Sequence, residues 1–293
     1  MVQGPEAADS AAAVAVIMTS HNRRSLTVES IRRVLDQEMD RPMDLTIFLA
    51  DDSSEDGTAE AAAILSERVR VLHGSGALYW AAGMARAESE ALSEGFDYLL
   101  WLNDDTFLSR EAVQTLVRVS EQNPDAIVVG AAREPDSRSV AYGARRRTSS
   151  WHPQRFELLP ESSGVQEADT FNGNIVLIPR RVHDRIGNID GEFPHAYADD
   201  DYGLRARAAG FRVLQAPGVL GECSRGPSVN PVRGWAAWRA AQDPKGLPWR
   251  AQVRFFRRHG GAIWPLTLLA QQVRMVVAWP NSGRGRNEVL DRS

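Results

Sequence analysis

The feature that most constrains the fold is a short apolar run that ends abruptly in adjacent acidic residues. Residues 98–102 (YLLWL) are few enough for a buried strand, and Asn103, Asp104 and Asp105 follow them directly. A carboxylate is costly to bury without a partner, so we expect this pair at the end of a strand, facing solvent, a cation or both. Carboxylate oxygens suit Mg²⁺ or Mn²⁺, which proteins usually hold together with substrate phosphates. Taken alone, the pair is equally consistent with an ordinary turn.

Apolar runs alternate with helix-like segments through the first 105 residues. We predict strands at residues 14–18, 45–50, 69–72 and 98–102, and helices at 25–36, 58–67 and 81–93. This alternation predicts an α/β fold with a mostly parallel sheet and helices on both faces. Ligands of such sheets bind at the carboxyl ends of the strands, where both acidic pairs, 51–52 and 104–105, are expected.

Beyond residue 105 the pattern loosens. We predict helices at 111–121 and 201–209, strands at 126–130 and 174–178, and a long excursion at 133–165. The tail from about residue 225 is rich in Trp and Arg and predicts a separate unit.

Composition limits where the chain works. Its one cysteine, Cys223, excludes an intrachain disulfide framework and agrees with a reducing compartment. Residues 1–13 lack the basic and continuous apolar regions of a signal peptide, and the first apolar run is too short to span a bilayer. We therefore expect a cytoplasmic protein.

The charge is unevenly distributed. Residues 225–293 carry 12 basic and 3 acidic side chains (+9), whereas residues 1–224 carry 22 and 35 (−13), which sum to the net −4. A basic tail beside an acidic body predicts an anionic partner. No zinc-finger spacing or aromatic RNA-binding motif is present, so nucleic acid is not expected. Residues 250–280 read as a basic, Trp-bearing amphipathic pair of helices suited to an anionic membrane surface. A helical cap or a dimer contact is the alternative, and the oligomeric state stays open.

Four passages, in order, resemble a family 2 glycosyltransferase with the nucleotide-sugar-binding GT-A fold. Residues 15–23 (AVIMTSHNR) are similar to the family's first strand and loop, and residues 49–58 (LADDSSEDGT) to its second-strand signature. Residues 102–106 (LNDDT) are similar to its metal-binding DxD element, and residues 197–205 (YADDDYGLR) to the acidic motif before its acceptor-side helix. The likeness covers roughly residues 14–224.

The resemblance implies an enzyme: an inverting transferase that moves a sugar from a nucleoside diphosphate donor to a glycan or lipid-linked acceptor. It implies a divalent metal, Mg²⁺ or Mn²⁺, and the following roles: Thr19 and Asp52 at the nucleoside with Asp51 beside them, Asp104 near the ribose or donor sugar, Asp105 on the metal, and Asp199 as catalytic base. Because spacing does not separate Asp199, Asp200 and Asp201, Asp201 is kept as the alternative base. The first subtype we name is rhamnosyl transfer in cell-envelope polysaccharide synthesis.

Other residues are weaker candidates. Tyr79 and Trp80, which follow a Gly-rich turn and open a small-residue helix, are expected to line the donor pocket; close packing of a turn is the alternative. Asn172 and Asn174 are candidates for acceptor binding. Cys223 aligns with a metal-ligating His of many family members, but a thiol is a poor Mg²⁺ ligand, so we expect a buried structural residue.

The resemblance also sets the expected domains: a flexible N-terminus at 1–13, a catalytic domain at 14–224 with a nucleotide-sugar half (14–105) and an acceptor half (106–224), and a basic helical extension at 225–293. Two other functions stay open. A nucleotidyltransferase would carry a Gly-rich loop after its first strand, which residues 19–24 lack. The other is a catalytically silent carbohydrate-binding or scaffold protein. A lipid-linked acceptor would bring the chain to the inner face of the cell membrane.

Overall fold

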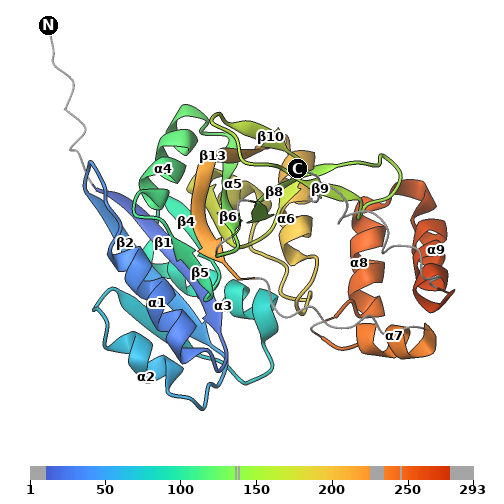
Figure 1. The fold of residues 1–293 in the computed structure, drawn as a ribbon, viewed down its shortest axis with the longest axis horizontal. Helices are drawn as coiled ribbons and strands as arrows, with labels where there is room; N and C mark the ends of the chain where they lie inside the picture. The colour runs from blue at the N-terminus through green and yellow to red at the C-terminus, as the bar shows by residue number, and fades with distance from the viewer. Residues whose placement is uncertain (1–10, 136, 138, 225–233, 245, 278–293) are drawn as a thin grey trace, which may run out of the picture. The chain divides into compact units, whose positions relative to one another are not determined.

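The computed structural model describes residues 11–135, 137, 139–224, 234–244 and 246–277 (Figure 1). The chain divides into two compact units, Met1–Gly226 and Pro227–Ser293. The finer boundaries expected from the sequence stay predictions.

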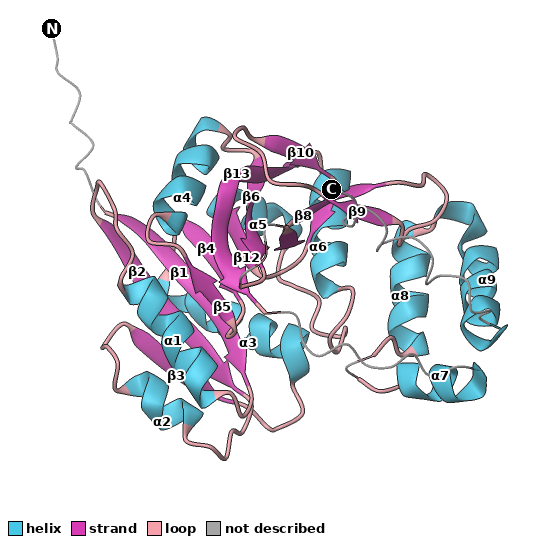
Figure 2. Cartoon of the chain, viewed as in Figure 1, coloured by secondary structure: helices cyan, strands magenta, loops and turns pink. Residues whose placement is uncertain are grey.

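The first unit is built on a ten-stranded sheet in the order β10-β13-β6-β12-β4-β1-β2-β3, with β5 paired to β13 and β7 to β6 (Figure 2). Strand β1 is parallel to β2 and β4, β2 is parallel to β3, and β6 to β13. Strand β12 runs antiparallel between β4 and β6. The strands are β1 (Ala12–Ser20), β2 (Met43–Asp51), β3 (Val69–His73), β4 (Tyr98–Leu102), β5 (Thr106–Leu108), β6 (Ala126–Arg133), β7 (Val140–Tyr142), β10 (Gln166–Ala168), β12 (Ile175–Pro179) and β13 (Arg212–Cys223). The predicted mostly parallel α/β sheet is confirmed.

Helices cover both faces of this sheet. Side chains alternate along a strand, so Leu100 and Leu102 of β4 join the core cluster that contains Ile31 of α1 and Val113 of α4. Helix α3 packs on β1 and β2, and α5 packs on β12. The helices of this unit are α1 (Arg24–Leu35), α2 (Thr58–Ala63), α3 (Tyr79–Glu94), α4 (Ala112–Gln122), α5 (Arg180–Ile186) and α6 (Ala198–Ala208).

The excursion predicted at residues 133–165 is partly ordered into strands. Strands β8 (Ala144–Arg147) and β9 (Phe156–Leu158) join β11 (Thr170–Phe171) in a three-stranded antiparallel sheet, in the order β11-β8-β9. This small sheet places the arginine run 145–147 near helix α6, because β11 also packs on α6.

Two helices of the first unit differ from the prediction by three or more residues at one end. Helix α6 begins at Ala198 instead of Asp201, so the three aspartates 199–201 lie in its first turn, where carboxylates interact favourably with the helix dipole. Helix α2 ends at Ala63 instead of Glu67. After it, the backbone N–H of Arg68 donates to Ser66 Oγ at 3.2 Å in the turn that leads to β3.

The second unit is helical: α7 (Gly234–Ala241), α8 (Trp249–His259), a 3₁₀ turn (Gly261–Ile263) and α9 (Trp264–Val277). Helix α9 packs on both α7 and α8. None of the described helices is long and apolar enough to cross a membrane.

Candidate functional site

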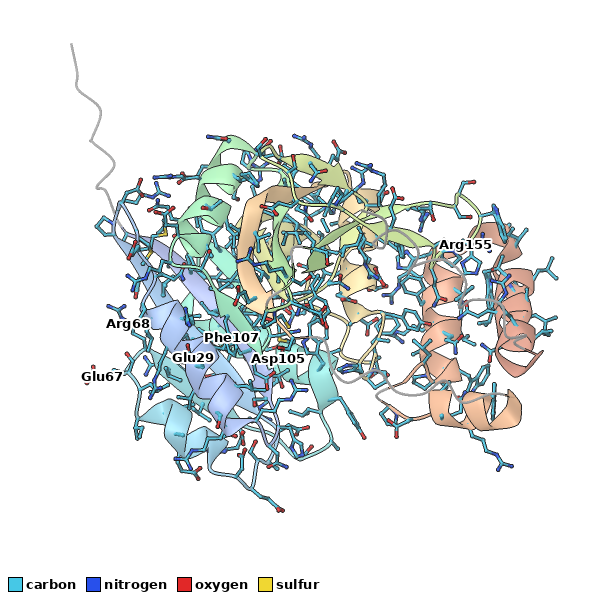
Figure 3. All side chains as sticks on the ribbon, viewed as in Figure 1. Glu29, Glu67, Arg68, Asp105, Phe107 and Arg155 are labelled. Atoms are coloured by element: carbon cyan, nitrogen blue, oxygen red, sulfur yellow. The ribbon has the colours of Figure 1, made fainter. Side chains whose placement is uncertain are left out.

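The predicted donor residues meet at one edge of the sheet. Strands β1, β2 and β4 are parallel and adjacent, so their carboxyl ends lie together. Thr19 lies at the end of β1, Asp51 at the end of β2, and Asp104 two residues past β4. Asp105, labelled in Figure 3, lies at the same edge, just before β5. The strand pattern, read from sequence, places these side chains correctly.

The side chain of Arg23 forms ion pairs with both members of the acidic pair, Asp104 and Asp105. The Arg23 guanidinium donates from Nη1 to Asp105 Oδ2 at 2.7 Å and to Asp104 Oδ1 at 3.2 Å. Burial raises the pKa of Asp104 to about 6, with Arg23 opposing the shift and the charge of Asp105 adding to it. Sequence reasoning missed Arg23, although it belongs to the passage that carries the family likeness.

Both oxygens of Asp52 are committed to backbone groups. Oδ1 accepts from the N–H of Gly76 at 2.6 Å, and Oδ2 from those of Leu78 at 2.8 Å and Tyr79 at 3.3 Å. This carboxylate therefore shapes the loop that leads into α3. Asp51 is buried as well; its Oδ2 accepts from the N–H of Ser54 at 3.0 Å, but its Oδ1 has no hydrogen-bond partner among the described residues.

Trp80 connects the sheet edge that carries Asp104 and Asp105 to the start of helix α6. Its indole Nε1 donates to Asn103 Oδ1 at 2.8 Å, next to the acidic pair. On the other side its ring lies against Gly173: a Cβ built there would be 2.6 Å from two ring carbons of Trp80 and 3.5 Å from the Cβ of Asp199. Asn103, which replaces the first acid of the DxD pattern, thus holds Trp80 between the acidic pair and the start of helix α6.

The structure separates the three adjacent aspartates. Asp201 is buried and paired with Arg205 at 2.8 Å. Asp200 is buried and forms an ion pair with Arg145; burial raises its pKa, and Arg145 offsets only part of that shift. Asp199 is half-buried, and its carboxylate accepts from the backbone N–H groups of Asp200 at 2.8 Å and Gly173 at 3.1 Å.

Arg145 is the second residue that sequence reasoning missed. It reaches Asp200 from β8, and its guanidinium carbon lies 5.3 Å from the centre of the Phe156 ring. The only signal was an arginine run in a segment with no clear element pattern, and nothing local connects that segment to the helix 55 residues further along.

The two candidate asparagines lie differently. Asn172 is half-buried, with its backbone N–H bonded to the carbonyl of Gly143 at 2.9 Å. Asn174 is buried, and its Nδ2 donates to Thr106 Oγ1 at 3.3 Å and Cys223 Sγ at 3.4 Å. The Cys223 thiol is buried in turn and donates to Asp105 Oδ1 at 3.5 Å. Burial, with the charge of Asp105, raises the pKa of this thiol to about 12, so it stays protonated.

Strained backbone marks the same region. Four described residues other than glycine have positive φ: Asn22, Ser53, Tyr79 and Tyr197. They lie in the loops after β1 and β2, at the start of α3 and before α6. Such conformations cost free energy and gather at functional sites.

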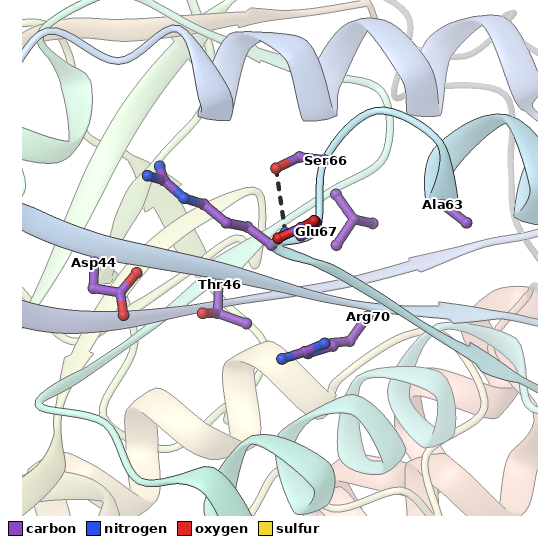
Figure 4. A pocket seen from close by; sticks show the side chains of 8 residues that line it. Asp44, Thr46, Ala63, Ser66, Glu67 and Arg70 are labelled. Atoms are coloured by element: carbon purple, nitrogen blue, oxygen red, sulfur yellow. Dashed lines mark hydrogen bonds between the residues drawn. The ribbon is translucent and has the colours of Figure 1, made fainter.

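A pocket lies at the other ends of β2 and β3, away from this region (Figure 4). It is lined by Asp44, Thr46 and six residues from the end of α2 to β3, and we assign it no role.

The acidic pair, Asp104 and Asp105, offers carboxylate ligands for a divalent metal but supplies only part of its coordination shell. The described residues contain no group of three or more His, Cys, Asp or Glu side chains arranged around a metal. Asp105 nevertheless presents a partly exposed carboxylate beside Asp104. Mg²⁺ typically takes one or two protein carboxylates and completes its shell with water and substrate phosphates.

Residues 15–187, more than half of the chain, match the sequence model of Glycosyl transferase family 2. The mannosyltransferase PcManGT of Pyrobaculum calidifontis, solved in complex with GDP-Man and Mn²⁺, is similar in structure, with a TM-score of 0.54 and 18% identity over 90% of this chain and 70% of that one. TarS of S. aureus is similar with a TM-score of 0.56 and 11% identity over 89% of this chain and 43% of that one, so this chain spans less than half of TarS. None of the curated proteins matches the chain.

Proposed function

The chain belongs to Glycosyl transferase family 2, and from that premise we propose that it transfers a sugar from a nucleoside diphosphate donor to a hydroxyl group of a glycan or lipid-linked acceptor. One observation carries the proposal. Trp80 touches the donor edge through Asn103 and lies against Gly173, whose backbone N–H holds Asp199. The expected donor motif and the expected base therefore border the same indole.

Asp199 is the base in this proposal, in preference to Asp201. Asp200 and Asp201 are each committed to an arginine, whereas two backbone N–H groups hold Asp199 at the surface. The carboxylate accepts the proton of the acceptor hydroxyl as its oxygen bonds to the anomeric carbon. The bond from that carbon to the diphosphate breaks on the opposite side, which inverts the configuration and requires no covalent enzyme intermediate.

The hydrogen bonds of Asp51 and Asp52 suggest which of the two contacts the donor. Asp51 keeps one carboxylate oxygen that accepts no hydrogen bond from the described residues, so we assign it to the nucleoside base. Asp52 contributes by shaping the 76–79 loop, with Thr19, Tyr79 and Trp80 as the remaining walls and Asp104 at the ribose or donor sugar. Asp105 would hold a divalent metal, which when bound stabilises the negative charge developing on the departing diphosphate. Asn172 stays an acceptor candidate, whereas the buried Asn174 supports Thr106 and Cys223.

The finer assignment is rhamnosyl transfer in cell-envelope polysaccharide synthesis, at the inner face of the cell membrane. It is supported by the amino-acid sequences of two motifs, residues 101–105 (WLNDD) and 171–174 (FNGN). The neighbour that was solved with GDP-Man and Mn²⁺ supports a nucleoside diphosphate hexose and a divalent metal in general.

The test is thermal stabilisation by a panel of nucleoside diphosphates and their sugars, with and without Mn²⁺. A ligand at about 100 times its Kd stabilises the native state by about 2.7 kcal/mol, or roughly 5–10 °C in Tm for a chain of this size. We expect a shift that is confined to one base and enhanced by Mn²⁺. Asp105→Asn should lose the Mn²⁺-dependent part of the shift, whereas the exposed control Asp44→Asn should keep all of it. No shift with any nucleotide would contradict the proposal and favour a binding or scaffold role.

A further inference from the structure

Helix α9 differs from an ordinary surface helix: polar glutamines accompany the buried Leu268 on its inward side, and large aliphatic side chains are exposed to solvent. Its inward side carries glutamines: Gln271 and Gln272 donate from Nε2 to Gln252 Oε1 at 2.9 and 2.8 Å, and Trp238 Nε1 donates to Gln272 Oε1 at 3.1 Å. Gln252 on α8 is fully buried and donates in turn to the carbonyl of Leu247 at 2.6 Å. The interior between these helices is therefore built partly from a connected amide network.

The outward side of α9 is apolar. Leu266, Leu269 and Val273 are 68%, 60% and 52% exposed, and Ala270 is exposed beside them. Their spacing of three, four and seven residues places them on one face of the helix. Ile263, just before the helix, is 45% exposed. A water-facing helix normally shows the reverse pattern, with its apolar residues packed inward.

The charge of the unit decides between occupants of this face. Six arginines lie in the described part of residues 234–277, against a single acidic residue, Asp243. Arg250, Arg254 and Arg257 are exposed on one face of α8, at positions i, i+4 and i+7. A second copy of the same basic unit would be repelled, whereas a surface of anionic lipid headgroups would be attracted. Apolar insertion combined with basic charge is how interfacial helices bind membranes.

We propose that the outward face of α9, formed by Ile263, Leu266, Leu269 and Val273, lies on an anionic lipid surface and inserts its aliphatic side chains among the headgroups. The helix is 14 residues long, so it lies in the interface and does not span it. The inference deepens the proposed function, on which it rests for its purpose: a chain held at the membrane by α9 meets a lipid-linked acceptor there.

The experiment is flotation of the full-length chain with vesicles of phosphatidylcholine alone or with one quarter phosphatidylglycerol. The parent should float with the anionic vesicles and much less with the neutral ones, and raised salt should weaken binding. The triple variant Leu266→Gln, Leu269→Gln, Val273→Gln should bind about tenfold less or weaker still. The control Ile64→Gln replaces an even more exposed aliphatic residue of the first unit, 84% exposed, and should float like the parent. Circular dichroism confirms that each variant is folded.

Other outcomes overturn the inference. A parent that stays unbound, that floats equally with neutral vesicles, or that floats unchanged after the triple substitution contradicts it. So does a parent that dimerises through this face, with the triple variant monomeric. The failure of this inference is distinct from that of the proposed function: a chain that floats but binds no nucleotide refutes only the transferase, and one that transfers sugar to a soluble acceptor but never floats refutes only the membrane contact.

Discussion

Replacing Asp104 by Asn should stabilise the folded chain, and the gain should grow with pH. Burial raises the pKa of this carboxyl from an ordinary 3.8 to about 6, despite Arg23 and with a contribution from Asp105. A raised pKa means that the folded state binds the proton more tightly than the unfolded chain does. Stability is therefore lost as pH rises from about 4 to above 6, because the carboxyl must ionise where water is excluded. Asn does not ionise, so the variant avoids this loss.

The size of the effect follows from the shift. About two pKa units correspond to roughly 3 kcal/mol at 1.36 kcal/mol per unit. By linkage, about half of this stability is already lost at pH 5 and nearly all of it at pH 8. The difference in unfolding free energy between variant and parent should therefore widen by roughly 1–2 kcal/mol from pH 5 to pH 8. Changes in hydrogen bonding that do not depend on pH cancel in this comparison.

Urea unfolding followed by circular dichroism at pH 5, 6, 7 and 8 measures this difference. Asp44→Asn, at an exposed position of β2, is the matched control and should run parallel to the parent at every pH. A gap between Asp104→Asn and the parent that stays constant, or that narrows as pH rises, would refute the reasoning. The same variant should lose the nucleotide-induced stabilisation, since the site keeps this carboxylate at the expense of stability.

Three further predictions concern other parts of the first unit. Asp199→Asn should lower kcat by about 10²- to 10⁴-fold and leave the nucleotide Kd nearly unchanged. Steady-state kinetics and titration calorimetry measure the two quantities, and an equal loss of turnover and of nucleotide affinity would contradict the role of a base. Gly173→Ala pushes its methyl group into Trp80 and should cost about 1–3 kcal/mol and lower kcat/KM, whereas Gly164→Ala, with no atom within 4 Å, should do neither. Burial opposes the charged form of His183, but its contact with Glu88, 3.0 Å away, outweighs this and raises the pKa. The stability that this pair contributes is thus full below about pH 6.5 and is lost as pH rises through the raised pKa. His183→Asn should therefore flatten this part of the pH profile of the unfolding free energy measured with urea, and an unchanged slope would contradict the prediction.

The sheet, and the edge at which Thr19, Asp51 and Asp104 meet, could be predicted because their signals are local. An apolar run such as 98–102, followed by carboxylates, identifies both a strand and the end at which it leaves the core. Adjacent parallel strands then bring Thr19, Asp51 and Asp104 to one edge without any knowledge of side-chain contacts.

Partners distant in sequence could not be predicted. Which of the three adjacent aspartates faces solvent depends on Arg205, one helical turn away, and on Arg145, 55 residues earlier. The length of the excursion that carries Arg145 gave no indication that β8 would pair with β11 and reach α6. Asn103 could be read only as a missing acid, because its hydrogen bond to Trp80 joins two elements whose packing no local pattern encodes.

The placement of Trp80 also provides an optical probe. Its indole donates to Asn103 beside the acidic pair, lies against Gly173 beside Asp199, and meets the buried Trp101 edge-on with ring centres 6.2 Å apart. Indole emission responds to hydrogen bonding and to neighbouring rings. Under the proposed function, binding of a donor beside the acidic pair or of an acceptor beside Asp199 should therefore change the intrinsic fluorescence of the chain. Trp80→Phe should remove that change, so one native side chain would report the order in which the two substrates bind.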